Sequence, residues 1–309
     1  MTDQTCPGHA DGGGERQGLP SRPPGTGVGT TRDSPPPGKP RSRKGPSRGR
    51  SRVFGRDPEA YHRARLPYPE RVYQVLVRRC GLRPGTATFE IGPGTGIATR
   101  ELLQRGASPL ALIEPDRRLV RFLRSTLVRA PTGVSFFPKP FEEVVLPPGS
   151  FDLGVAATSF HWLPERGALR KVARALRPGG WWAAWDNFHG DPFRPSPFHD
   201  ALQPVYRQLH GPGTKRTSRA QAEADRRARL AALRSVGAFH RIDREDIHWS
   251  VELPVLRLQA LWGSFSDILT LSPGRRRWFL TELARVVDEE FSGTVRLPML
   301  TTLYTACRR

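Results

Sequence analysis

Apolar runs and helix-like stretches alternate five times between residues 87 and 189. The apolar runs at 87–91, 110–113, 134–137, 151–157 and 181–185 predict strands. The run 151–157 is almost continuously apolar, which is typical of a central parallel strand buried on both faces. The alternation of strands with helices predicts an α/β fold with a doubly wound, mostly parallel sheet.

The pattern changes after residue 189. Residues 190–218 are rich in Pro, Phe and His and predict a lid-like insertion above the sheet. An Ala- and Arg-rich helix at 219–236 and a sixth strand at 239–251 follow. Two further helices form an expected helical cap at 254–291, and a last strand is expected at 295–306.

A glycine-rich turn follows the first strand. Gly92, Gly94 and Gly96 stand between the apolar run and a helix-like stretch, which predicts strand, tight turn and helix. Glycines let a backbone approach a bound group closely, and the helix N-terminus behind them offers free N–H donors. Glu114 ends the next apolar run, 18 residues after Gly96. This spacing places Glu114 to accept hydrogen bonds from both ribose hydroxyls of a nucleoside cofactor.

Four segments stand in a fixed order along the chain. They are Glu-Ile-Gly-Pro-Gly-Thr-Gly at 90–96, Ile-Glu-Pro-Asp at 113–116, Gly-Ser-Phe-Asp-Leu at 149–153 and Phe-His-Trp at 160–162. As an ordered set they resemble the class I S-adenosylmethionine-dependent methyltransferases of the small-molecule branch. The resemblance covers residues 54–309, with a cofactor-binding half at 54–188. It implies a Rossmann-like sheet with a seventh, antiparallel strand, and S-adenosylmethionine as the cofactor.

The resemblance also implies roles for residues around the turn. The segment 54–69 would fold over the cofactor, with Tyr61 as a wall and Arg65 as an anion contact, or these two residues would pack the first helix onto the sheet. Phe141 would stack on the adenine base and Glu142 would lie near its edge, or both would belong to a plain loop. The whole expected cofactor site consists of Tyr61, Arg65, Glu90, Gly92, Gly94, Gly96, Glu114, Phe141, Glu142 and Thr158.

Methyl transfer in the resembled family needs mainly the positioning of the reactants, because the methyl group is already activated. A hydroxyl or amine acceptor would add the need for a base, for which histidine is suited. His161 and His189, in loops after strands four and five, are the catalytic candidates, with packing or cofactor-side roles as the alternative. The expected partner is a small-molecule methyl acceptor, in an apolar pocket roofed by Phe193, Phe198, Trp262 and Phe265.

Residues 1–53 have a composition of their own. They contain no aromatic residue, 20 Gly and Pro, ten Lys or Arg and four acidic residues, which predicts a disordered tail. We expect this tail to be dispensable. Translation could start at Val53, because a GTG codon serves either as an internal valine codon or as a start codon. A basic tail that binds nucleic acid is the competing hypothesis.

The net charge of +20 raises nucleic acid as a partner. Arg outnumbers Lys 44 to 5, as a high-GC coding bias would give, so we disfavour this reading. A nucleic-acid base methyltransferase would carry an (Asn/Asp)-Pro-Pro-aromatic motif after strand four, where this chain has Thr-Ser-Phe-His at 158–161. A non-catalytic cofactor-binding protein is a second alternative. A nicotinamide oxidoreductase is third, and Ile97 argues against it because a glycine is expected there.

The three cysteines, Cys6, Cys80 and Cys307, are far apart and lack Cys-x-x-Cys spacing. This argues against a disulfide framework and a zinc site, and fits a cytoplasmic protein. No apolar run approaches the 18 residues of a membrane helix, so no membrane partner is expected.

Overall fold

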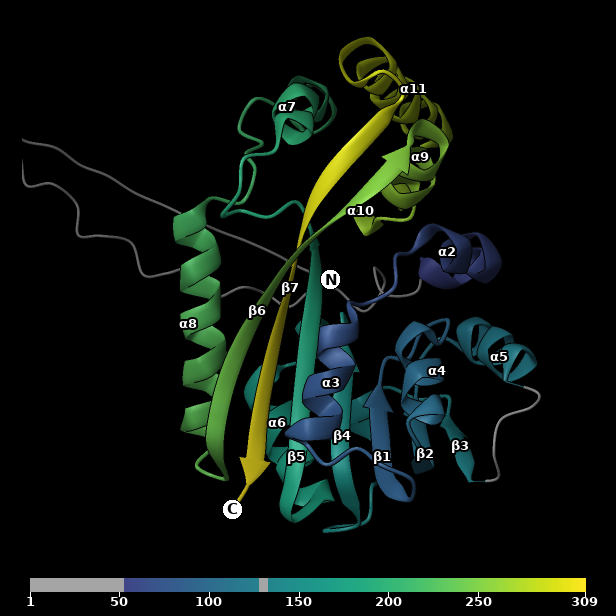
Figure 1. The fold of residues 1–309 in the computed structure, drawn as a ribbon. Helices are drawn as coiled ribbons and strands as arrows, with labels where there is room; N and C mark the ends of the chain where they lie inside the picture. The colour runs from purple at the N-terminus through teal and green to yellow at the C-terminus, as the bar shows by residue number, and fades with distance from the viewer. Residues whose placement is uncertain (1–52, 128–132) are drawn as a thin grey trace, which may run out of the picture. The chain divides into compact units, whose positions relative to one another are not determined.

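A seven-stranded sheet forms the centre of the fold in the computed structural model, which describes residues 53–127 and 133–309 (Figure 1). The strands are β1 (Thr86–Ile91), β2 (Ala107–Ile113), β3 (Val134–Phe137), β4 (Phe151–Ala157), β5 (Leu176–His189), β6 (Phe239–Pro254) and β7 (Thr294–Arg308). Their order in the sheet is β3-β2-β1-β4-β5-β7-β6. Strand β7 runs antiparallel to β5 and β6, and the other strand pairs are parallel. The predicted doubly wound, mostly parallel α/β sheet with an antiparallel seventh strand is confirmed.

Helices cover both faces of the sheet. They are α2 (Pro58–Ala64), α3 (Glu70–Arg78), α4 (Ile97–Gln104), α5 (Arg117–Thr126), α6 (Glu165–Ala175), α7 (Pro197–His210), α8 (Arg219–Ser235), α9 (Val255–Gly263), α10 (Ser266–Leu269) and α11 (Pro273–Phe291). Short 3₁₀ turns lie at Phe54–Arg56, Phe141–Glu143 and Phe160–Trp162. Asp116 caps α5 by accepting a hydrogen bond from the Arg118 N–H, as its position before an apolar-periodic stretch predicted.

Strand β5 shows why the apolar runs are continuous. Alternate side chains of a strand point to opposite faces. Trp182 and Ala184 pack into the core formed with α6 and α8, whereas Trp181, Ala183 and Trp185 pack into the core formed with α3 and α4. Both faces of β5 are therefore buried, and no polar face interrupts its sequence.

Strand β5 begins earlier than its apolar run predicted. Leu176 pairs with Phe151, and the next pairing joins Trp181 to Leu153, so the intervening residues form an irregularity in the strand. Their glycines and proline led us to expect a turn that ends the preceding helix.

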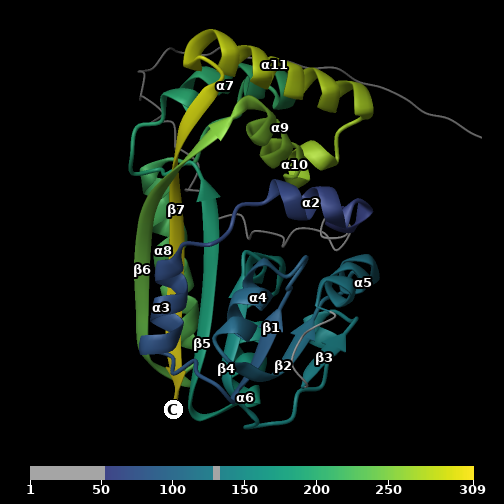
Figure 2. The ribbon, with the colours of Figure 1, turned by 45° about the vertical axis from the view of Figure 1, so that its right-hand side comes forward.

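Strands β5, β6 and β7 extend beyond the other strands and carry a helical layer (Figures 1 and 2). This layer, which we call the cap, consists of α7 and α9–α11 with the upper parts of β6 and β7, and it has a separate apolar core. Three helices occupy the predicted cap at 254–291 rather than two, because the chain turns after Gly263 and again before Pro273. Both views place α2 between the cap and the loops at the edge of the sheet.

The described helices include none that is long and apolar enough to cross a membrane. The predicted tail at 1–53 lies, apart from Val53, outside the described residues.

Candidate cofactor and acceptor site

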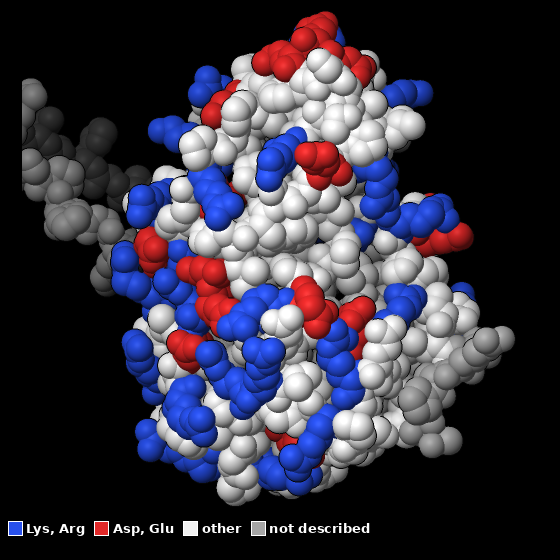
Figure 3. Space-filling model, viewed as in Figure 1, with Lys and Arg blue, Asp and Glu red and all other residues white. Residues whose placement is uncertain are grey.

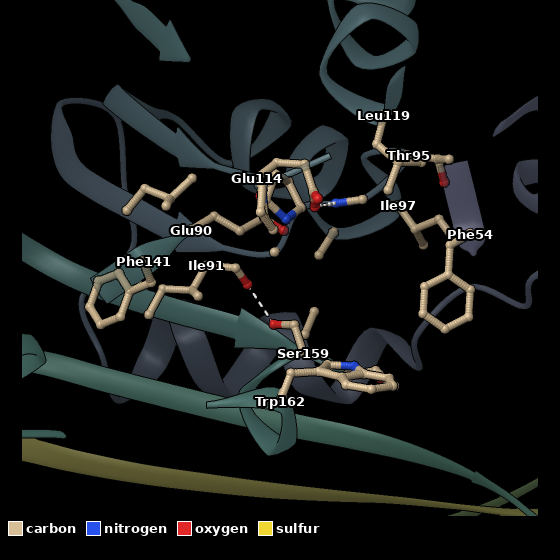
Figure 4. Close-up of a pocket in the computed structure, with 18 of the residues that line it drawn as sticks. Phe54, Glu90, Ile91, Thr95, Ile97, Glu114, Leu119, Phe141, Ser159 and Trp162 are labelled. Atoms are coloured by element: carbon tan, nitrogen blue, oxygen red, sulfur yellow. Dashed lines mark hydrogen bonds between the residues drawn. The ribbon is translucent and has the colours of Figure 1, made fainter. Parts of the chain in front are cut away.

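A cavity of about 320 Å³ lies at the carboxyl ends of β1, β2 and β4. The order of the strands reverses between β1 and β4, and open α/β sheets bind their ligands at this switch point. The loops after these strands and the segment 54–68, which contains α2, line the cavity. Figure 4 shows Glu90 and Glu114 on one side of the cavity, Ser159 and Trp162 on the other side, and Phe54 at one end.

The glycine turn takes the backbone geometry that the sequence predicted. Gly92, Gly94 and Gly96 all have positive φ, at 67°, 58° and 84°. Gly92 and Gly94 line the cavity, whereas Gly96 does not. A Cβ on Gly96 would lie 2.3 Å from the Leu123 side chain, so this glycine lets α4 pack against α5. Its role is therefore in packing the turn.

Glu114 is held by the turn itself. One carboxylate oxygen accepts a hydrogen bond from the Gly94 N–H at 3.1 Å, and the other accepts one from the Asp116 N–H at 2.9 Å. Burial raises the pKa of Glu114 to about 7, against the lowering effect of these two donors. Each oxygen retains a lone pair, so Glu114 can still accept hydrogen bonds from a ligand.

Glu90 is fully buried at the end of β1 and lines the cavity. One oxygen accepts a hydrogen bond from the Thr99 hydroxyl at 2.6 Å, and Oε1 has no partner in the protein. Burial raises the pKa of Glu90 to about 7, although the Thr99 hydrogen bond acts in the opposite direction. An unsatisfied buried carboxylate oxygen that faces a cavity indicates a site for a donor group of a ligand.

The segment 54–68 brings aromatic side chains and one arginine to the cavity. The rings of Phe54 and Tyr61 lie 5.2 Å apart, and Phe54 meets the edge of Trp162 at 6.1 Å. Arg65 follows α2 and also lines the cavity. Both predicted residues of this segment, Tyr61 and Arg65, therefore face the site.

Phe141 and Glu142 also line the cavity. The Phe141 ring is buried and stacks in parallel with Phe89 at 6.5 Å, and the Lys171 ammonium lies 4.9 Å from its centre. This ring therefore belongs to the core as well as to the cavity wall. Glu142 is exposed at the rim.

The two histidines have different surroundings. His161 is 41% exposed, and its Nδ1 lies 3.1 Å from an Asp186 carboxylate oxygen, outside the cavity lining. His189 lines the cavity and lies 4.7 Å from the Phe265 ring. Burial, and then the positive charges of Arg65 and His199, lower the pKa of His189 to about 3. His189 is therefore neutral near pH 7 and a weak base.

The sequence analysis missed three polar residues that line the cavity, namely Tyr68, Ser159 and Asn187. The Tyr68 hydroxyl donates to the Thr158 hydroxyl at 3.2 Å, and burial raises the Tyr68 pKa. Thr158, which was predicted, has the positive φ of 51° that turns the chain out of β4. Asn187 lines the cavity beside Thr158, and Ser159 donates to the Ile91 carbonyl at 2.5 Å. The position of Asn187 at the end of the fifth apolar run was the available signal.

The predicted aromatic roof is wrong, because none of its four residues, Phe193, Phe198, Trp262 and Phe265, lines the cavity. Phe198 and Trp262 are buried in the cap core, with rings 5.2 Å apart at right angles. Phe193 packs beneath the guanidinium of Arg226 at 4.0 Å. Phe265 contacts His189, which lines the cavity, but is itself outside the lining. Phe198 and Trp262 belong to the apolar core of the cap, and Phe265 packs against it.

The comparisons with known proteins agree with this geometry. A model of the methyltransferase domain matches residues 89–184, which span β1 to β5. A solved structure from Anaeromyxobacter dehalogenans, named a "putative type II methyltransferase", has the same fold, with a TM-score of 0.55 and 18% identity, over 79% of this chain and 97% of that one. The chain therefore has the class I methyltransferase fold, and its residues 89–184 match the methyltransferase domain.

Curated relatives match the chain over shorter stretches. An uncharacterized methyltransferase of Mycobacterium tuberculosis is 33% identical over 127 residues, which are 41% of this chain and 49% of that protein. A ribosomal RNA small subunit methyltransferase A of Methylococcus capsulatus is 51% identical over 53 residues, which are 17% of this chain and 20% of that protein. The match thus spans 49% of the length of the first relative and 20% of the length of the second.

The residues that line the cavity fit the predicted cofactor, S-adenosylmethionine. Glu114 keeps free lone pairs, Glu90 Oε1 lacks a donor, and the space beside Gly94 where a Cβ would lie is open. These features suit hydroxyl and amino groups of a ligand close to the turn. The described residues contain no group of three or more His, Cys, Asp or Glu that could hold a metal ion.

Charge on the surface of the protein is mixed. Figure 3 shows many Lys and Arg side chains on one face, interspersed with acidic ones. Arg71 pairs with Glu245 and Arg79 pairs with Asp243 across α3 and β6. These arginines are partly neutralised by neighbours in the fold.

Proposed function

We propose that the chain is an S-adenosylmethionine-dependent methyltransferase that transfers a methyl group to a small molecule. The observation that carries this proposal is Glu114, which is tied to Gly94 of the glycine turn beside the cavity. A carboxylate held by the turn recognises ribose hydroxyls in nucleoside-binding α/β proteins.

Named residues have distinct tasks in this proposal. Glu114 accepts hydrogen bonds from the ribose, Glu90 and the turn at Gly92 and Gly94 receive the amino-acid end of the cofactor, and Phe141 with Glu142 borders the adenine. The bound cofactor supplies an activated methyl group. The protein then holds the acceptor in line with that group, which contributes about 7–11 kcal/mol of orientation. His189, whose pKa burial lowers, is a weak base, and Tyr68, whose pKa burial raises, keeps its proton, so positioning carries the reaction.

The wall formed by residues 54–68 favours a small molecule over nucleic acid. This segment, which contains α2, lines the cavity together with the loops after the strands, whereas a base inside a polymer needs an open route to the site. The match to a ribosomal RNA methyltransferase favours the alternative, but it covers 17% of this chain. We further propose that the protein acts in the cytoplasm.

Calorimetry with S-adenosylhomocysteine tests the cofactor site. The wild-type protein should bind it, and a Glu114→Ala variant should bind about tenfold to a hundredfold more weakly, because charge-assisted hydrogen bonds are lost. Equal affinity of the two proteins would place the ribose elsewhere. Products 14 Da heavier than their precursors, found by mass spectrometry after incubation with cell extract and cofactor, would distinguish an enzyme from a non-catalytic binding protein.

A further inference from the structure

Arg65 is a cation in the cavity wall, and none of the acidic residues that the structure describes is its counter-ion. Its Nη2 donates to the Ser264 carbonyl at 3.2 Å, and its buried Nε has no hydrogen-bond partner. Within the described residues, no carboxylate forms an ion pair with it. The rings of Tyr61 and Phe265 lie 4.8 and 5.2 Å from Cζ, and aromatic faces offset the loss of water around a cation only in part. The guanidinium therefore still has donors for an anion.

Asn187 presents a second donor, and a chain of hydrogen bonds fixes its direction. The Trp249 indole, which can only donate, gives its Nε1–H to the Thr301 hydroxyl at 3.0 Å. Thr301 in turn donates its own proton to Asn187 Oδ1 at 2.6 Å. The Asn187 amide nitrogen must then point the other way, where one N–H reaches the Pro67 carbonyl at 3.4 Å. The second N–H remains for a ligand in the cavity that Asn187 lines.

Charge is segregated along the cavity. The acidic lining residues are Glu90, Glu114, Glu142 and Glu143. Glu90 lies within the end of β1, and the other three follow β2 or β3. Arg65 is the one Lys or Arg among the described lining residues, and it lies on the wall formed with β5. His189, two residues after Asn187 on the same face of β5, adds no charge because burial and Arg65 keep it neutral. This wall thus carries one positive charge and several donors.

We propose that the methyl acceptor is a small organic acid whose carboxylate is received by Arg65 and Asn187. One positive charge matches a carboxylate better than a phosphate dianion, and the guanidinium fork fits two carboxylate oxygens. The apolar body of the acid would lie against Phe54, Tyr61 and Trp162. This inference rests on the proposed methyltransferase function.

Fractionation of the acceptor tests the class directly. Small molecules of a cell extract are separated on an anion exchanger at pH 7, and each fraction is incubated with the protein and S-adenosylmethionine that carries a deuterated methyl group. The label should enter compounds of the retained fraction. Label confined to the unretained fraction would overturn the acid acceptor while the methyltransferase function stands. Failure of the wild-type protein to bind S-adenosylhomocysteine would overturn the function itself, and this proposal with it.

Variants then separate the acceptor from the cofactor, whose own carboxylate is the competing occupant of Arg65. With the labelled acid purified as acceptor, Arg65→Gln should raise its KM about tenfold to a hundredfold and leave the Kd of S-adenosylhomocysteine within about threefold. Arg65→Lys should recover part of the loss, since it keeps the charge without the fork. The matched control is Arg78→Gln on the exposed side of α3, which removes the same charge away from the cavity. A weaker Kd with unchanged acceptor KM would assign Arg65 to the cofactor and overturn the proposal.

Asn187 supplies an independent readout. Asn187→Asp keeps the size of the side chain but replaces the donor by a negative charge, so it should raise the acceptor KM more than Asn187→Ala does. Thr301→Val removes the proton that orients the amide without lining the cavity, and should raise KM with little change in the Kd of S-adenosylhomocysteine. Equal effects of Asp and Ala at position 187 would show that no anion lies there.

Discussion

At the scale of single residues, Glu114 combines burial with a need to be ionised. Its pKa is raised to about 7, and ribose hydroxyls donate to the ionised carboxylate. Binding therefore lowers this pKa and releases a proton below pH 7. We expect the Kd of S-adenosylhomocysteine to weaken as pH falls below 7, with Glu114 contributing at most about tenfold per pH unit. Calorimetry at pH 6, 7 and 8 would measure this, and Glu114→Gln should flatten the dependence. An equally steep dependence in that variant would assign it to Glu90.

His189 should make the fold sensitive to acid. The pKa of His189 is about 3 in the folded protein, below the ordinary value of 6.5. Between these two pH values, His189 is therefore protonated in the unfolded chain and neutral in the folded protein. The stabilising effect is complete above pH 6.5 and is lost as pH falls toward 3. Relative to His189→Asn, the wild-type protein should lose up to about 1.4 kcal/mol of unfolding free energy per pH unit in this window. Parallel denaturant curves at pH 7, 6 and 5 measure the difference, and a constant difference would mean that His189 is not enclosed.

The sequence predicted the residues of the site whose roles depend on the backbone. Glycines at 92 and 94 and the carboxylate at 114 stand at the ends of short apolar runs, where periodicity locates them well. The sequence did not predict Asn187 and Tyr68 as site residues. The directions of their side chains depend on hydrogen bonds to Thr301 and Thr158, which are far away in the chain. Separation of His161 from the cavity likewise follows from the face of β5 that Asp186 occupies.

At the scale of elements, His62 ties helix α2 to the glycine turn through contacts with Thr95 and Arg100. We call these contacts the latch. Arg100 can only donate, so its contact at 3.3 Å makes His62 Nε2 an acceptor and puts the ring proton on Nδ1, which donates to the Thr95 hydroxyl at 3.1 Å. Burial, and then the charge of Arg100, lower the pKa of His62. A protonated His62 would direct an N–H at the Arg100 guanidinium, so acid should weaken the latch.

We expect S-adenosylhomocysteine to dissociate faster as pH falls below 6.5 in the wild-type protein, since the hydrogen bonds of His62 hold α2, whose Tyr61 lines the cavity, against the glycine turn. Stopped-flow measurements at pH 7, 6 and 5 would record the rate. His62→Gln can accept from Arg100 and donate to Thr95 at every pH, so its rate should stay constant over this range. A wild-type rate independent of pH would contradict the latch.

This latch illustrates a limit of periodicity. Helix α2 has seven residues, of which Ala64 alone is buried, so no apolar stripe announced it. Helices α3 and α5 bury three or four apolar side chains each against the sheet, and their spacing predicted them.

At the scale of the whole molecule, the described residues build separate apolar cores, two large ones on the faces of the sheet and another in the cap. The sequence predicted the sheet because βα alternation allows few topologies. It did not predict where the cap aromatics point, since a helix rich in Phe and Trp can face a ligand or its own neighbours. In the structure, Phe198 and Trp262 point into the cap core, where they pack with Leu202, Leu258 and Phe279.

Trp262 is 1% exposed and lies between Phe198 and Phe265, so Trp262→Ala should leave a cavity in the cap core. We expect a loss of about 3–5 kcal/mol in unfolding free energy, measured with denaturant. The Kd of S-adenosylhomocysteine for the fraction that remains folded should change little, because the cofactor residues belong to the sheet. Phe188→Ala, at a side chain 45% exposed, is the control and should cost far less. Near-normal stability of the Trp262 variant with weakened ligand binding would instead mean that Trp262 reaches the cavity after all.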